Sequence, residues 1–139
     1  MEVNQKCIFC KIVAKEAPCS LIYEDNSVMA FLDIRPLNMG HTLVIPKAHY
    51  VDIFDIPEAD LKAVHVISKQ VALAVKEVTN ADGISVIQQN GKPAGQDIFH
   101  LHVHVVPRFD GQQLPRFSDL ELAERTKLNE IAEKIRQKM

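Results

Sequence analysis

Three histidines alternate with apolar residues in the stretch FHLHVHVVPRF, at positions 99–109. The chain has six histidines, and half of them, His100, His102 and His104, fall within five positions here. Successive side chains of a strand point to opposite faces, so this spacing predicts a strand with three imidazoles on one face. The other face would join the core, with Phe99, Leu101, Val103 and Val105. Imidazoles serve switching, proton transfer and metal binding, so we expect a functional site on the histidine face.

Two cysteines stand two residues apart near the N-terminus, in the stretch CIFC at 7–10. This gap is typical of a zinc knuckle or of a redox pair, and the spacing alone leaves both open. A structural zinc needs about four ligands, so two would come from elsewhere. The histidines alone are a poor zinc site, because the Cα atoms of His100 and His104 would lie roughly 13 Å apart on a regular strand. A split arrangement is favoured, in which one histidine joins the cysteines and the others do chemistry.

A glycine-containing loop, QNGKPAGQD at 89–97, leads directly into the histidines. Its glycines, Gly91 and Gly95, allow backbone N–H groups to approach an anion closely. The loop is not a P-loop, because Pro93 follows Lys92 where Ser or Thr would be required. By itself it could be an ordinary hairpin connection. Its position before three histidines favours phosphate binding.

The elements that would hold these motifs follow from hydrophobic periodicity. Strands are expected at 21–24, 27–33, 41–46, 84–89 and 98–106. A long helix is expected over 58–79, with Asp55 as its N-cap, and a C-terminal amphipathic helix over about 118–138, opened by Ser118. This order predicts one domain over residues 1–139, of the α+β class, with an antiparallel sheet and helices packed against it.

Composition excludes several classes of partner and location. The chain has 139 residues, 47% of them hydrophobic, and a formal net charge of −2, so no charge-driven affinity for nucleic acid or a membrane is expected. No apolar run is long enough for a signal peptide or a membrane span. A reducing, cytoplasmic location is expected, with the cysteines as thiols or metal ligands. Cys19 is expected to be a small, half-buried apolar residue.

These stretches together resemble a known family, the histidine triad (HIT) nucleotide-binding proteins. The family signature is His-φ-His-φ-His-φ-φ, with φ apolar, and HLHVHVV at 100–106 matches it at every position. GQ at 95–96, DIRPLNMGHTLVIPKAH at 33–49 and the IF-x-KI pattern at 8–12 also match. The resemblance covers about positions 7–109 and implies a HIT-like fold with a five-stranded sheet, one long helix and a C-terminal helical extension.

The resemblance implies a role for each active-site histidine. His102 matches the family nucleophile, which attacks the α-phosphorus of a nucleotide and gives a nucleotidyl-histidine intermediate. His104 matches the histidine that hydrogen-bonds the phosphate, and His41 matches another active-site histidine near the leaving group. A hydrogen bond from the Nδ1–H of His102 to a backbone carbonyl would fix its tautomer and direct Nε2 at phosphorus.

The resemblance also implies a nucleotide pocket. The residues expected around the base and ribose are Ile8, Phe9, Ile12, Phe31, Asp33 and Ile34, with Asp33 on the ribose hydroxyls. Those expected around the phosphate are Gln89, Gly95, Gln96, Asp97, His102 and His104. Asp97 departs from the family pattern, because many members carry Ser or Thr there. A carboxylate would repel an anion, so only its backbone N–H could help to bind phosphate.

In the zinc-containing bacterial branch of the family, the ligands match Cys7, Cys10, His49 and His100. The resemblance therefore implies one structural zinc per chain, in the split arrangement that the distances favour. It also implies a homodimer, assembled through the long helix and the strand beyond the glycine-containing loop. The helix at 58–79 is apolar on more than one stripe, with Val66 and Ala74 beside its core positions.

The function implied is a nucleotidyl hydrolase or transferase that acts on purine nucleotide derivatives, such as nucleoside phosphoramidates or dinucleoside polyphosphates. The alternative is a non-catalytic, zinc-stabilised nucleotide sensor or protein-interaction module with the same fold. His102 and His41 favour the enzyme, because binding alone needs no nucleophile. The sequence leaves the leaving group and the choice between adenine and guanine open.

Overall fold

The computed structural model describes residues 6–139, apart from the side chain of Phe117. The first five residues, part of the stretch in which no signal peptide is expected, lie outside the described residues. The strands are β1 (Leu21–Glu24), β2 (Val28–Leu32), β3 (Thr42–Pro46), β4 (Gly83–Gln88) and β5 (Val103–Arg108). The helices are α1 (Ile8–Val13), α2 (Glu58–Thr79) and α3 (Arg125–Arg136), with 3₁₀ turns at Lys92–Ala94 and Phe117–Asp119.

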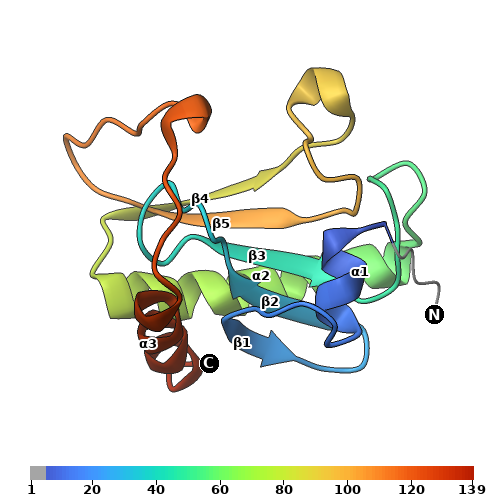
Figure 1. Cartoon of the computed structure of the whole chain (residues 1–139), viewed down its shortest axis with the longest axis horizontal. Helices are drawn as coiled ribbons and strands as arrows, with labels where there is room; N and C mark the ends of the chain where they lie inside the picture. Colours follow the sequence, from blue (N-terminus) through green and yellow to red (C-terminus); the bar gives the residue numbers. More distant parts are fainter. Residues whose placement is uncertain (1–5) are drawn as a thin grey trace.

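The five strands form one antiparallel sheet in the order β1-β2-β3-β5-β4 (Figure 1). β3 and β5 occupy the middle of the sheet, where Leu43 is paired with His104 and Val44 with Val103. β4 forms one edge and β1 the other. The predicted α+β class and five-stranded antiparallel sheet are confirmed, and β1 to β4 agree with their expected ranges within one residue at each end.

One face of the sheet packs against α2 and α3, and it holds the larger core. Figure 1 shows α2 running along the far side of the sheet and α3 next to β1. The strands contribute alternate residues to this core, as the period of a strand requires. Its fully buried members include Ala30, Val44, Val103 and Val105 of the strands, Val64, Val71 and Val75 of α2, and Ala132 and Ile135 of α3.

The opposite face carries α1 and the histidines. A second apolar cluster forms there from Phe9, Ile12, Met29, Phe31, Leu43 and Ile45. The ring of Phe9 lies edge-on to His100 and His102, with centroids 5.7 and 5.2 Å away. The sheet therefore separates the main core from the histidine face, as the alternation predicts, and α1 covers that face. No helix is expected over residues 8–13 from the sequence pattern, so α1 is a finding of the structure.

β5 begins at Val103, five residues later than predicted. The preceding segment has its own polar partners: the Leu101 N–H donates to the Tyr50 carbonyl at 2.7 Å, and the His100 ring donates to the Pro46 carbonyl at 2.8 Å. His100 and His102 consequently precede the strand, and His104 lies within it. The placement of Phe99 in the core is wrong, because this side chain is 48% exposed.

Two helix starts differ from the predictions because nearby polar groups are used differently. The N-cap of α2 is Pro57, not Asp55, whose carboxylate accepts from the N–H groups of Val51 and Asp52 in the preceding loop. α3 begins at Arg125 and not near Ser118, because the Ala123 N–H donates to the Ile34 carbonyl at 2.9 Å. That bond fixes the segment before α3 against residues 33–35. Within residues 6–139, none of the helices combines the length and apolar character needed to cross a membrane.

Candidate active site

His102 has one ring nitrogen fixed and the other directed at open space. Its Nδ1 lies 2.8 Å from the carbonyl oxygen of His100. A carbonyl oxygen only accepts, so Nδ1 carries the proton and Nε2 keeps its lone pair. Nε2 lies 3.8 Å from Oδ1 of Asp97, and His102 lines a cavity. This is the carbonyl contact and the tautomer expected of a nucleophilic histidine.

His104 is oriented by a chain of hydrogen bonds that begins on the backbone. The Leu37 N–H donates to Nδ1 of His41, so Nε2 of His41 carries the proton and donates to Nδ1 of His104 at 2.9 Å. The remaining proton of neutral His104 is therefore on Nε2. His41 and His104 also lie near Asp33, with donor atoms within 4.8 Å of one another, but these ring contacts identify a hydrogen-bond chain and not a metal site. His104 is thus left with an N–H donor for an anion.

Burial keeps these imidazoles neutral. It lowers the pKa of His41 to about 3 and that of His104 to about 4, and the charges of neighbouring histidines act in the same direction. Burial also lowers the pKa of His102, against the hydrogen bond to His100 and the carboxylate of Asp97, which raise it. A neutral imidazole is a nucleophile near pH 7 without a separate base.

A cavity of about 500 Å³ opens beside His102 and His104. Its volume falls in the range of small-molecule sites, which are mostly apolar with a few converging polar groups. The apolar wall includes five predicted residues: Ile8, Phe9 and Ile12 from α1, Phe31 from β2, and Ile34. Ile8 and Ile34 are each 45% exposed and lie at the surface of the cavity.

Asp33 stands at the end of β2 and lines the same cavity. Its Oδ1 accepts from the Arg35 N–H at 2.9 Å, and its Oδ2 lies 3.6 Å from Nε2 of His41. Burial raises the pKa of this carboxyl, and the negative charge of Asp97 adds to the effect. A carboxylate oxygen in this position is a suitable acceptor for ribose hydroxyls.

Three residues predicted to contact phosphate organise the loop and do not line the cavity: Gln89, Gly95 and Gln96. The Gln96 side chain is buried, accepts from the Gly91 N–H and donates to the carbonyls of Val51 and Ile98. Gly95 has φ +99°, and a Cβ there would lie 2.4 Å from Nε2 of Gln89, so this position requires glycine. The loop delivers Asp97, which does line the cavity.

One wall of the cavity is not expected from the sequence. The C-terminal segment contributes Leu120 and Arg125, Arg35 follows the predicted residue Ile34, and Cys19 comes from the segment between α1 and β1. Arg35 Nη1 donates to the Leu120 carbonyl at 3.5 Å, and Arg125 Nη1 donates to Ser20 Oγ at 3.0 Å. Nothing in the local pattern marks Arg125, because a basic residue at the start of an amphipathic helix is normally solvated.

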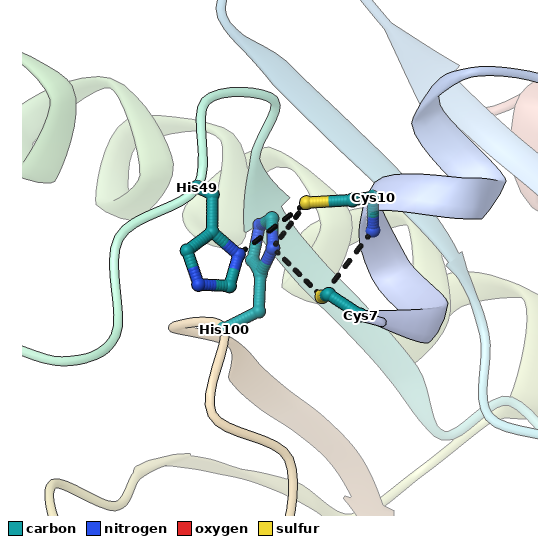
Figure 2. Close-up of side chains that lie close together, drawn as sticks. All are labelled: Cys7, Cys10, His49 and His100. Atoms are coloured by element: carbon teal, nitrogen blue, oxygen red, sulfur yellow. Dashed lines mark hydrogen bonds between the residues drawn. The ribbon is translucent and has the colours of Figure 1, made fainter. Parts of the chain in front are cut away.

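Cys7, Cys10, His49 and His100 converge from three separate segments (Figure 2). Their ligand atoms lie within 4.8 Å of one another. The Cys7 Sγ to His100 Nδ1 distance is 3.4 Å, and Cys10 Sγ lies 3.3 Å from His49 Nδ1 and 3.6 Å from His100 Nδ1. Tetrahedral zinc sets sulfur and nitrogen ligands about 3.6 Å apart. The four donors therefore fit a zinc ion, and the structure brings together the set expected from the sequence.

The protonation of His100 agrees with metal binding. Its Nε2 lies 2.8 Å from the Pro46 carbonyl, so Nε2 carries the proton and Nδ1 presents its lone pair to the sulfurs. Histidine ligands of metals usually donate their other N–H in this way, which fixes the ring and its tautomer. Cys7 is also the N-cap of α1, and its sulfur accepts from the Cys10 N–H. The donor cluster is thereby built into the start of α1.

Known proteins share this architecture over nearly the whole chain. A HIT-like protein involved in cell-cycle regulation from Bartonella henselae is 37% identical, with a TM-score of 0.90 over 99% of this chain and 100% of that chain. A zinc-bound histidine triad family protein from Mycobacterium smegmatis is 39% identical, with a TM-score of 0.84 over 95% of this chain and 91% of that one. An adenylylsulfatase of Arabidopsis thaliana is 39% identical over a matched region that covers 76% of this chain and 54% of the adenylylsulfatase.

The fold and the histidine cluster define a protein of the histidine triad class. A family model for the HIT domain matches residues 14–111, which include His41, His102 and His104, and the chain belongs to this family. The match begins after α1, so Cys7 and Cys10 lie outside it although His49 and His100 lie within. The predicted family is confirmed.

Proposed function

We propose that the chain is a nucleotidyl hydrolase or transferase that cleaves at the α-phosphate of purine nucleotide derivatives. HIT family membership and the related adenylylsulfatase support nucleotide hydrolase or transferase activity as a class. The observation that carries the specific proposal is the tautomer of His102. Its Nδ1–H is held by the His100 carbonyl, which directs a neutral, unprotonated Nε2 into the cavity.

The cavity supports a bound nucleotide in one orientation. The base packs between the apolar side chains of α1 and β2, in particular Phe9, Ile12 and Phe31. The ribose hydroxyls donate to Asp33, which leaves the α-phosphate at His102 and His104. Gln89, Gly95 and Gln96 act from behind the cavity wall, because they hold the loop that ends at Asp97.

The reaction proceeds in two displacements. In the first, Nε2 of His102 forms a bond to the α-phosphorus, and the bond from phosphorus to the leaving group breaks with its electron pair on that group. The Nε2–H of His104 donates to a phosphoryl oxygen and stabilises the charge that develops there. In the second, the oxygen of water, or of another acceptor, bonds to phosphorus and gives its proton to solvent, while the Nε2–P bond breaks with its electron pair on Nε2. His41 supports both steps by keeping His104 in the correct tautomer.

We propose one structural zinc per chain, held by Cys7, Cys10, His49 and His100. Four protein ligands close the coordination shell, so the ion supplies structure and no metal-bound water. Its effect is to tie α1 to the segment before β5. Because Phe9 and Ile12 lie on α1, the ion also keeps the base pocket assembled.

Turnover by purified protein on a panel of substrates tests the proposal. We expect release of the nucleoside monophosphate from at least one nucleoside phosphoramidate, adenylyl sulfate or dinucleoside polyphosphate. Quenching with alkaline denaturant during turnover, which preserves the acid-labile Nε2–P bond, should show a mass increase of one nucleotidyl group on the tryptic peptide with His102. Tight binding of adenosine monophosphate with no turnover across the panel would instead assign a nucleotide-binding module.

A further inference from the structure

Asp97 is an acidic side chain beside the nucleophile. Its Oδ1 lies 3.8 Å from Nε2 of His102, and its side chain is 79% exposed. A phosphorus atom ready for attack lies about 3–3.5 Å from the nucleophilic atom. The carboxylate therefore belongs to the immediate surroundings of the reacting phosphoryl group. No step of the proposed mechanism uses it, and by charge alone it opposes the binding of an anion.

The positive charges of the cavity lie elsewhere. Among the described residues that line it, the permanently cationic ones are Arg35 and Arg125. The Arg35 guanidinium donates to the Leu120 carbonyl in the C-terminal segment. The guanidinium of Arg125, which itself belongs to that segment, donates to the Ser20 hydroxyl. The field of Asp97 acts on Asp33, His102 and His104, that of Arg35 acts on Asp33, and that of Arg125 acts on Cys19. The two histidines at the phosphate end, His102 and His104, therefore feel the charge of Asp97 and that of neither arginine.

Asp97 also borders a second hollow, of about 310 Å³, on the side of the zinc-ligand cluster. This hollow shares Ile8, Asp97 and Ile98 with the nucleotide cavity. Among its described lining residues the basic ones are Lys6 and His49, and neither lines the nucleotide cavity. A group leaving the α-phosphorus toward this hollow passes the carboxylate at the junction.

We propose that Asp97 selects the leaving group by charge: the site favours nucleoside phosphoramidates, which release an amine, over substrates that release sulfate or a phosphate chain. This proposal rests on the proposed nucleotidyl chemistry. The α-phosphate is common to all these substrates, so its repulsion by Asp97 does not discriminate among them. The charge that differs is the charge of the leaving group.

The chemistry of P–N cleavage gives the carboxylate a favourable role. The amine nitrogen takes a proton from solvent, the P–N bond breaks with its electron pair on nitrogen, and the Nε2–P bond to His102 forms. Protonation places a positive charge on the nitrogen while it is still bonded to phosphorus, and a nearby carboxylate stabilises this cationic state until the P–N bond breaks and releases the neutral amine. A sulfate or phosphate leaving group carries negative charge instead. For an exposed carboxylate at a few ångströms, repulsion amounts to roughly fivefold to tenfold in rate for each extra charge.

The test compares kcat/KM for three adenosine substrates: a phosphoramidate of an uncharged alkylamine, adenosine 5′-phosphosulfate and diadenosine tetraphosphate. Asp97→Asn removes the charge and keeps the shape, and we expect it to lower the phosphoramidate-to-phosphosulfate ratio about tenfold. Asp97→Glu should keep that ratio within about threefold. Asp110→Asn, which removes one charge outside the cavity, should leave it unchanged. Equal effects of Asp97→Asn on all three substrates, or a higher ratio, would overturn the proposal.

A binding measurement tests the same charge effect without turnover. Calorimetry should show that the wild-type protein binds adenosine monophosphate more tightly than adenosine diphosphate. Asp97→Asn should reduce the ratio of the two dissociation constants by fivefold or more. If no substrate is turned over and the ratio of the two affinities still narrows, the proposed function fails and with it the selection of a leaving group, while the charge effect of Asp97 on bound nucleotides stands. If turnover occurs but Asp97→Asn changes neither the phosphoramidate-to-phosphosulfate ratio of kcat/KM nor the ratio of the two nucleotide affinities, the charge selection fails and the proposed function stands.

Discussion

Nε2 of His41 lies 2.9 Å from Nδ1 of His104, and this contact reinforces the burial that keeps both rings neutral. His41 already accepts from the Leu37 N–H through its other nitrogen. An added proton on His41 would displace the Leu37 bond, and one on Nδ1 of His104 would set two donors against each other. The buried site has no hydration to compensate for either loss.

This arrangement predicts a specific dependence of stability on pH. The pKa of His41 is about 3 in the folded protein and near its usual 6.5 when the chain is unfolded, so below pH 6.5 the unfolded chain binds the extra proton. Stability should therefore fall as the pH drops from 6.5 toward 3, by up to about 1.4 kcal/mol per pH unit for this residue. Urea denaturation between pH 7.5 and 5 measures the effect.

His41→Gln provides the comparison, because glutamine retains a donor toward His104 but does not titrate. Its free energy of unfolding should fall less steeply with acidification, by about 2 kcal/mol less than wild type between pH 6.5 and 5. Protonation of the zinc ligands and carboxyl groups affects both proteins equally and cancels. His65→Gln, on the exposed side of α2, should reproduce the wild-type curve. An unchanged slope for His41→Gln would show that His41 already binds a proton in the folded state.

The sequence predicted those parts of the molecule that depend on local pattern. Alternating apolar residues define β1 to β4 within one residue at each end, and helical spacing defines α2. The grouping of Cys7, Cys10, His49 and His100 was also expected, but from the family resemblance. Spacing alone left the second pair of ligands open.

The errors concern residues whose partners are distant in sequence. The start of β5 depends on bonds from Leu101 and His100 to Tyr50 and Pro46, which no local pattern reveals. The start of α3 depends in the same way on the bond between Ala123 and Ile34. That bond also brings the C-terminal segment to the cavity, so the contributions of Leu120 and Arg125 could not be found from periodicity.

Loss of the zinc ligands should reduce stability more than catalysis. We expect one zinc per chain by elemental analysis of protein purified without chelators. Cys7→Ala should lower the melting temperature by about 10 °C, because an incomplete cluster no longer ties α1 to the sheet. Nucleotide affinity should weaken several-fold, since Phe9 and Ile12 line the cavity from α1, while kcat changes less than about threefold.

Cys19→Ser is the matched control, because Cys19 lies outside the metal cluster and its replacement should leave the zinc content at one per chain. Chelation of zinc from the wild-type protein should reproduce the fall in melting temperature that Cys7→Ala gives. Protein that contains no zinc, and that melts at the same temperature with and without chelator, would contradict a structural metal.

We expect a homodimer whose interface includes α2 and β4. The strand beyond the glycine-containing loop, which the family resemblance implies for this interface, does not take part. β5, the strand beyond the glycine-containing loop, is paired on both sides and cannot join another sheet, whereas β4 has a free edge among the described strands. Val66 and Leu73 lie one heptad apart on α2 and are 57% and 63% exposed, and Val86 of β4 is 51% exposed. Ala74, expected on this stripe, is buried in the main core. Light scattering at micromolar concentration should give twice the chain mass.

Charged substitutions on this stripe should separate the chains. Val66→Glu combined with Leu73→Glu places two desolvated charges in the interface, and we expect a monomeric mass with secondary structure unchanged by circular dichroism. Leu122→Glu is the control, because Leu122 is 61% exposed but belongs to the segment before α3 and to neither α2 nor β4. A monomeric wild-type protein, or a dimer that survives the double substitution, would show that this surface is not the interface.

The last prediction concerns the nucleophile, His102. His102→Ala should reduce turnover by at least about 10⁴-fold, because the covalent intermediate cannot form. It should bind adenosine monophosphate within about fivefold of the wild-type affinity, since Asp33, His104 and the apolar wall remain. His102→Gly leaves space for a free imidazole, and added imidazole should restore part of the activity in a saturable manner. The same imidazole should not rescue His104→Gly, whose role is donation to the phosphate from a fixed hydrogen-bond chain. Near-wild-type turnover by His102→Ala would mean that water attacks phosphorus directly and that the fixed tautomer of His102 serves binding alone.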